Sequence, residues 1–131
     1  MAERSRILVI DDDEAIREVF SMILRQKGYE VDTAQNATEA IEKSRSNLYH
    51  LTLVDIRLPD MEGTKLLEQL MDTTPKMKKI IVTGYPSLNN SVESLNQGAD
   101  GYLMKPVDAA TLLNMVEKHL NERRQEEHYS E

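Results

Sequence analysis

Residues 51–63 read LTLVDIRLPDMEG and place an acidic residue directly after an apolar run. The run at 51–54 has the length of a buried strand, and the next residue is Asp55. An isolated buried carboxylate is costly, so proteins usually pair it or neutralise it. We therefore expect other segments of the chain to bring compensating groups to Asp55.

Further short segments have the length and the apolar or β-branched composition of strands. Segment 29–34 alternates between apolar and polar residues, as a half-exposed edge strand should. The expected strands besides 51–54 are 7–10 (ILVI), 29–34 (YEVDTA), 80–82 (IIV) and 102–104 (YLM).

Between these strands, apolar residues recur at the spacing of one helix face, which indicates five helices. The stripes begin at Ile16, Ala37, Gly63, Leu88 and Ala109. Residues suited to helix boundaries flank them, with Asn36 and Ser87 as N-caps and Gly28 and Gly98 as left-handed C-terminal residues.

Strands that alternate with helices predict an α/β fold, namely a doubly wound five-stranded parallel sheet with helices on both faces. The 131 residues fit one domain, 1–131, with a core over 6–121. The polar tail, 122–131, is either an extension of the last helix or a frayed end.

The composition excludes several classes of function. With 16 basic and 23 acidic residues, the net charge of -7 argues against direct binding of nucleic acid. The chain has no cysteine and no apolar run long enough to span a bilayer, so we expect a cytoplasmic protein without membrane contact. His50, His119 and His128 do not have the spacing of metal ligands, and we expect all three on the surface.

Polar residues follow four of the predicted strands, at the edge of the sheet where such folds bind ligands. Taken singly, each has an ordinary structural role, such as a helix cap for Asp13 or a solvated lysine for Lys105. Their convergence on one edge favours a functional site. The residues are Asp11, Asp12, Asp13, Asp55, Thr83 and Lys105.

The charges of this cluster indicate its chemistry. Two carboxylates about 5 Å apart repel each other by roughly 3 kcal/mol at an effective dielectric constant of about 20, so three of them favour a bound cation. A site of oxygen ligands without histidine or cysteine suits Mg²⁺. Asp55 could then act as a nucleophile toward phosphorus, with Lys105 and Thr83 stabilising the phosphoryl oxygens and Gly84 leaving space for them.

Four motifs resemble, in order and spacing, the receiver domain of two-component response regulators. They are VIDDDE at 9–14, LVDIRLPDMEG at 53–63, IVTGY at 81–85 and GADGYLMKP at 98–106. The resemblance covers residues 6 to about 121 and implies a flavodoxin-like fold with strand order 2-1-3-4-5. The DIRLP and VTGY segments are similar to receivers of enhancer-binding transcription activators.

The resemblance also implies a role for each site residue. Asp55 corresponds to the phosphoacceptor, and the bond between Lys105 and Pro106 is expected to be cis. Asp12 corresponds to a direct metal ligand, Asp11 to a ligand through water, and Arg57 to a ligand through its main-chain carbonyl. Thr83 and Tyr102 correspond to the switch residues. Lys105 corresponds to the residue that pairs with the phosphate.

We therefore expect a signalling phosphoacceptor rather than an enzyme, modified in a Mg²⁺-dependent reaction by a histidine kinase or a phosphotransfer protein. Self-association through the fourth helix, the fifth strand and the fifth helix is an option for the activated form. The large side chains of Arg57 and Tyr85 flank the site and are expected to slow loss of the phosphoryl group.

Two alternatives remain open. A haloacid-dehalogenase phosphatase also uses an aspartate and Mg²⁺, but its DxD[TV] pattern would need threonine or valine where this chain has Glu14. A pseudo-receiver that binds partners without accepting phosphate typically loses site residues, and this chain keeps them.

Overall fold

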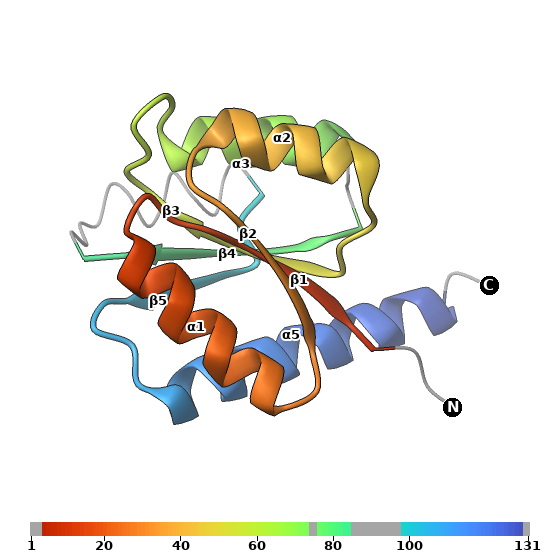
Figure 1. The fold of residues 1–131 in the computed structure, drawn as a ribbon. Coiled ribbons are helices and arrows are strands. Elements are labelled where there is room, and N and C mark those ends of the chain that lie inside the picture. The colour runs from red at the N-terminus through yellow and green to blue at the C-terminus, as the bar shows by residue number, and fades with distance from the viewer. Residues whose placement is uncertain (1–3, 74–75, 85–97, 130–131) are drawn as a thin grey trace.

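The computed structural model describes residues 4–73, 76–84 and 98–129. Its strands form one five-stranded sheet in the order β2-β1-β3-β4-β5, and every neighbouring pair is parallel (Figure 1). This confirms both the fold class and the strand order. The strands are β1 (Arg6–Ile10), β2 (Glu30–Ala34), β3 (Leu51–Asp55), β4 (Lys78–Thr83) and β5 (Gly101–Met104).

Helices cover both faces of the sheet, with α2 and α3 on one side and α1 and α5 on the other (Figure 1). All five residues of β3 are buried, because a central parallel strand is covered on both faces. Two apolar clusters result, one between the sheet and each helix pair. The helices are α1 (Glu14–Gln26), α2 (Ala37–Ser46), α3 (Gly63–Thr73) and α5 (Ala109–Tyr129).

The predicted helix boundaries are confirmed where the structure describes them. Asp13 is the N-cap of α1 and accepts a hydrogen bond of 2.9 Å from the amide of Ala15. Asn36 caps α2 in the same way, through the amide of Glu39. Gly28 ends the turn after α1 with a φ of +93°, a conformation that favours glycine.

The tail after Leu120 continues α5 as a helix as far as Tyr129. The Nζ atom of Lys78 lies 2.7 Å from a carboxylate oxygen of Glu126, and a guanidinium nitrogen of Arg124 donates to Ser5 Oγ at 3.3 Å. The contacts join the end of α5 to the first residue of β4 and to the residue that precedes β1. Of the two outcomes expected for the tail, the helix extension is the one observed.

The expectation that all three histidines lie on the surface is wrong. His119 is 4% exposed and packs against Gly101, whose missing side chain leaves space for the imidazole ring. Its Nδ1 lies 3.0 Å from a carboxylate oxygen of Glu122. His50 is half-buried, and its Nδ1 accepts the amide hydrogen of Arg6 at 2.9 Å. The side chain of His128 lies outside the described residues.

Strand β4 begins two residues earlier than predicted and buries two lysines. Burial lowers the pKa of Lys79, and the nearby charge of Asp100 opposes this effect. The Nζ of Lys79 donates to the Met77 carbonyl at 2.6 Å, while the main-chain amide of Lys79 donates to Asp100. Hydrogen bonds at the ends of these side chains make the burial tolerable.

Several predictions lie outside the described residues, namely the helix stripe of Leu88, Val92 and Leu95, its cap Ser87, and Tyr85. Within the described ranges, no helix combines the length and the apolarity that crossing a membrane requires.

Candidate functional site

The acidic residues of the site are positioned by two neighbouring strands. Asp55 is the last residue of β3, and Asp11 directly follows β1, where its amide donates to the Ala34 carbonyl at 3.1 Å. Asp11 is fixed further because its Oδ1 accepts the amide of Asp13 at 2.9 Å and its carbonyl accepts a guanidinium hydrogen of Arg17 at 2.7 Å. Three hydrogen bonds, to Ala34, Asp13 and Arg17, thus hold Asp11 in place.

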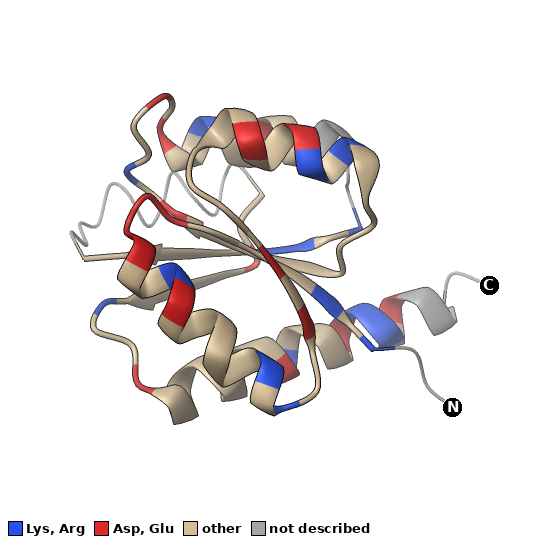
Figure 2. Cartoon of the chain, viewed as in Figure 1, with Lys and Arg blue, Asp and Glu red and all other residues tan. Residues whose placement is uncertain are grey.

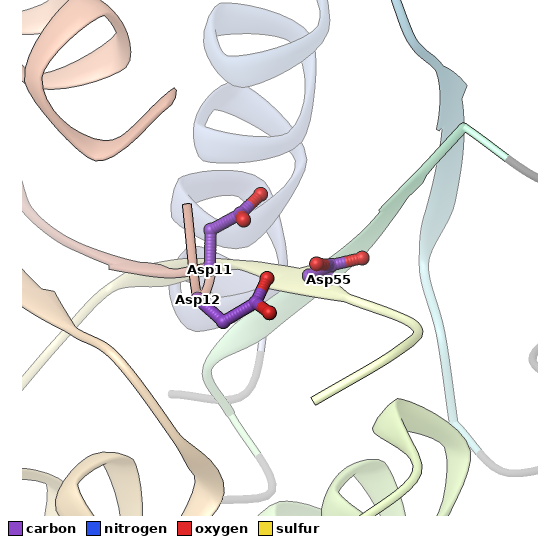
Figure 3. Close-up of side chains that lie close together, drawn as sticks. All are labelled: Asp11, Asp12 and Asp55. Atoms are coloured by element: carbon purple, nitrogen blue, oxygen red, sulfur yellow. The ribbon is translucent and has the colours of Figure 1, made fainter. Parts of the chain in front are cut away.

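Carboxylate oxygens of Asp11, Asp12 and Asp55 all lie within 4.8 Å of one another, between the ends of β1 and β3 (Figure 3). Asp11 and Asp55 are buried and Asp12 is exposed, so the cluster reaches from the protein interior to solvent. Figure 2 shows the acidic turn between β1 and α1 at this edge of the sheet. The sequence prediction that these three residues meet is confirmed.

Lys105 is the cation that the structure brings to the acidic cluster. Its Nζ lies 2.8 Å from Oδ2 of Asp11 and 3.7 Å from Oδ2 of Asp55. The main chain fixes Lys105, because its amide donates to the Thr83 carbonyl at 2.8 Å. Burial disfavours the charged ammonium, but the carboxylates of Asp11 and Asp55 outweigh this effect and raise the pKa of Lys105.

The carboxyl group of Asp55 is harder to ionise than an ordinary aspartate. Burial, together with the negative charge of Asp11, raises the pKa of Asp55 to about 6. Lys105 and the amide of Arg57, which donates to Oδ1 of Asp55 at 3.3 Å, act in the opposite direction. Asp55 is therefore mainly ionised at neutral pH, at a cost that a cation would reduce.

The donor set fits a hard divalent cation. It offers three carboxylates against the single ammonium of Lys105, and oxygen ligands of this kind suit Mg²⁺. The residual negative charge attracts a cation, and the exposure of Asp12 lets a cation reach the cluster from solvent. Asp11, Asp12 and Asp55 are therefore residues that could hold a metal ion.

Thr83 and Gly84 complete this edge of the sheet. Thr83 is the last residue of β4, fully buried, and pairs with Met104 of β5. Gly84 is exposed, and a Cβ atom there would lie 3.8 Å from the Lys105 side chain. That is an ordinary van der Waals contact, and the space expected here for a phosphoryl group stays a prediction.

Tyr102 lies on β5, where it pairs with Ile81 and packs against the apolar cluster beneath α2 and α3. Its ring is half-buried, and its hydroxyl has no hydrogen-bond partner in the part of the chain that the structure describes.

The structure also places the other predicted residues near the site. Arg57 is exposed beside Asp55, and the Lys105–Pro106 bond is cis. The sequence had no role for Asp60 or Arg17, whose contacts depend on the tertiary fold.

Comparisons with known proteins agree with this geometry. Residues 7–117 match the family described as response regulator receiver domain. The crystal structure of a CheY-like receiver domain protein from Methanospirillum hungatei JF-1 superposes with a TM-score of 0.93 and 50% sequence identity, covering 95% of this chain and 99% of that one. NtrX from Brucella abortus superposes with a TM-score of 0.92 and 26% identity, over 98% of this chain and 30% of NtrX.

Two transcription regulators are similar in sequence. The transcriptional regulatory protein ZraR of Klebsiella oxytoca is 39% identical over 106 residues, which are 81% of this chain and 24% of ZraR. The DNA-binding transcriptional regulator NtrC of Escherichia coli K12 is 34% identical over 129 residues, 98% of this chain and 26% of NtrC. The chain thus spans about a quarter of the length of these relatives. The family match, the fold and the acidic triad agree, and the chain belongs to the response regulator receiver domains, the CheY-like domains of two-component signalling.

Proposed function

We propose that the chain accepts a phosphoryl group on Asp55 from a phosphorylated histidine kinase or phosphotransfer protein. One observation carries the proposal. Asp55 is a buried carboxylate with the ammonium of Lys105 at 3.7 Å and carboxylate oxygens of Asp11 and Asp12 within 4.8 Å. This arrangement supplies a nucleophile, an ammonium that can offset the charge of an incoming phosphoryl group, and carboxylates that could hold a cation for the same purpose.

In the proposed transfer, an oxygen of Asp55 forms a bond to phosphorus while the bond between phosphorus and the donor imidazole nitrogen breaks. The imidazole leaves with the electron pair of that bond. Lys105 and the hydroxyl of Thr83 stabilise the charge on the phosphoryl oxygens. Mg²⁺, when held by Asp11, Asp12, Asp55 and the carbonyl of Arg57, would add positive charge at the same oxygens.

The proposed output is a change in packing around Thr83 and Tyr102. Attraction of the Thr83 hydroxyl toward the phosphoryl group would vacate space beside β5, which the ring of Tyr102 can fill. Supporting this, Tyr102 is half-buried and no hydrogen bond within the described residues fixes its hydroxyl. The altered surface includes β5 and α5 and could bind a partner or a second copy of the chain.

Labelling with acetyl phosphate, followed by intact-mass measurement, tests the proposal. The wild type should gain one phosphoryl group with Mg²⁺ and none with EDTA, and Asp55→Asn should remain unlabelled. Asp13→Asn is the matched control, because Asp13 lies in the same acidic turn but caps α1, a role that asparagine also fills. Label that persists in Asp55→Asn, or that forms equally well in EDTA, contradicts the proposed site.

A further inference from the structure

Asp60, in the loop that joins β3 to α3, forms a cap on a helix from another part of the chain. Its Oδ1 accepts the amide of Ala37 at 2.9 Å, and its Oδ2 accepts the amide of Thr38 at 2.9 Å and the hydroxyl of Thr38 at 2.7 Å. Ala37 and Thr38 begin helix α2, more than 20 residues before Asp60. One carboxylate therefore joins the β3–α3 loop to the start of α2.

This contact completes the hydrogen bonding at the start of α2. The first amides of a helix have no partner within the helix. Asn36, the local cap, satisfies Glu39 alone, and Asp60 supplies the acceptors for Ala37 and Thr38. These hydrogen bonds lower the pKa of Asp60, and the bond from Ala37 has the largest effect. The carboxylate therefore stays charged at the N-terminus of α2, where the helix dipole favours a negative charge.

The same loop is closed at its base, next to Asp55. The amide of Gly63 donates to the Ile56 carbonyl at 2.8 Å, and Arg57 and Glu62 form an isolated antiparallel bridge. A Cβ atom on Gly63 would lie 2.6 Å from the Asp55 carbonyl oxygen, which leaves no space for a side chain. The base of the loop therefore lies against the main chain beside the nucleophile, where a displacement of the loop tip would act.

Several contacts hold the loop tip, among them a long hydrogen bond of 3.8 Å from Nε2 of Gln69 on α3 to Sδ of Met61. Leu58 and Met61 are partly buried against the apolar cluster beneath α2 and α3, and such contacts are not directional. The three hydrogen bonds of Asp60 are directional and fix the tip relative to α2. The bonds of Asp60, at 2.7–2.9 Å, are shorter than that of Met61, and they are the hydrogen bonds described here that tie the loop to α2.

We propose that Asp60 is a positioning residue, which ties the β3–α3 loop to α2 and so holds the Arg57 carbonyl where it would serve as a ligand of Mg²⁺. The inference rests on the proposed function and extends it to a residue that touches neither metal nor phosphate. It assigns α2 a role in the site, as the fixed support of the loop.

The chain offers a matched pair of variants. Asp60→Ala removes the cap that comes from the loop, and Asn36→Ala removes the local cap from the same helix end without touching the loop. Both weaken α2, but only Asp60→Ala should displace Arg57. Asp60→Asn keeps one carbonyl oxygen for the amide of Ala37 and should give an intermediate result, and it serves as the second variant if alanine compromises folding.

Mg²⁺ titration of the full chain, followed by amide chemical shifts, measures the effect without any phosphorylation. Asp60→Ala should weaken Mg²⁺ binding about tenfold, the scale on which residues behind the direct ligands affect metal affinity. Asn36→Ala should bind Mg²⁺ as the wild type does. In metal-free protein, the amide of Gly63 should exchange its hydrogen faster in Asp60→Ala than in Asn36→Ala.

The outcomes separate the two proposals. Equal Mg²⁺ affinity in Asp60→Ala and wild type overturns the positioning role alone, and so does an equal loss in Asn36→Ala, which would reflect a general weakening of α2. A wild type that shows no Mg²⁺-dependent shifts at Asp11, Asp12 or Asp55 overturns the proposed function and the inference together.

Discussion

The Nζ atom of Lys105 lies 2.8 Å from Oδ2 of Asp11, a residue 94 positions earlier in the chain. This ion pair crosses from the loop after β5 to the end of β1, and the side chain of Asp11 is only 3% exposed. Removal of one partner from such a pair leaves the other charge buried without compensation. The charge of Lys105 should therefore support folding as well as phosphoryl transfer.

Lys105→Ala should lower the free energy of unfolding by about 1–2 kcal/mol at pH 7.5 in EDTA, a value reduced from that of a fully buried pair because Lys105 is partly exposed. The loss should shrink at pH 4.5, because the pKa of Asp55 is raised to about 6 and this neighbour of Lys105 takes up a proton below that value. Urea unfolding at both pH values measures it. Lys105→Arg keeps the charge and is the control, and an equal loss at both pH values contradicts the electrostatic explanation.

Asp55→Asn should make the metal-free protein more stable at neutral pH. The pKa of Asp55 in the folded protein, about 6, lies above its ordinary value of 3.8, so the folded state binds this proton more tightly than the unfolded state. The stabilisation from this proton is complete below about pH 4 and is lost as the pH rises through about 6.

At pH 7.5 in EDTA the gain in Asp55→Asn should be at most about 3 kcal/mol, which is the free-energy equivalent of the shift. Thermal unfolding across pH 4 to 8 measures it. Saturating Mg²⁺ should raise the midpoint of the wild type more than that of the variant. A gain that does not depend on pH would show that ionisation of Asp55 is not its cause.

Beryllofluoride, a phosphoryl mimic, should change amide signals well beyond the site. If Thr83 and Tyr102 move together, the changes should extend over 102–116 and over 87–97, the second of which lies outside the described residues. Two-dimensional NMR of wild type and Thr83→Ala provides the comparison. Changes of equal extent in both proteins, or changes confined to the neighbours of Asp55, would show that this switch does not operate.

Loss of the phosphoryl group should be faster in Arg57→Asn and Tyr85→Glu than in wild type. Hydrolysis needs a water molecule in line with the phosphorus–oxygen bond, and the two large side chains are expected to restrict its approach. The structure places Arg57 on the surface beside Asp55, and Tyr85 lies outside the described residues. Decay of the label in both single variants and the double variant measures this, and unchanged decay in all three refutes the shielding.

Apolar periodicity was sufficient to predict the sheet and the described helices, because burial drives the placement of those residues. It was insufficient at β4, where Lys78 and Lys79 have the composition of a loop and are buried through partners distant in sequence, such as Glu126. His119 was misplaced for a similar reason. Its burial depends on Gly101 of β5, whose missing side chain leaves space for the ring. The residues that neighbour His119 in the sequence do not show that it packs against this strand.

The residues of the site likewise fall into those that the sequence predicts and those that it does not. Its acidic residues and Lys105 were predictable because the carboxyl ends of parallel strands meet at one edge. Asp60 was not, since a cap on a helix more than 20 residues away leaves no local pattern in the sequence. The hydrogen bond from Arg17 to the Asp11 carbonyl spans only six residues, but it depends on the path of the turn between β1 and α1, which residue types alone do not give.

The close approach of Gly63 to the main chain of Asp55 has a consequence for mutational scanning. Any side chain at position 63 must push against the carbonyl oxygen of Asp55 or against Ile56, because a Cβ atom would meet them at 2.6 Å and 2.8 Å. In a saturation library scored separately for abundance and for phosphorylation, position 63 should therefore lose phosphorylation in variants that still accumulate. Gly63, which has no side chain, would then be as sensitive to substitution as the residues that take part in phosphorylation.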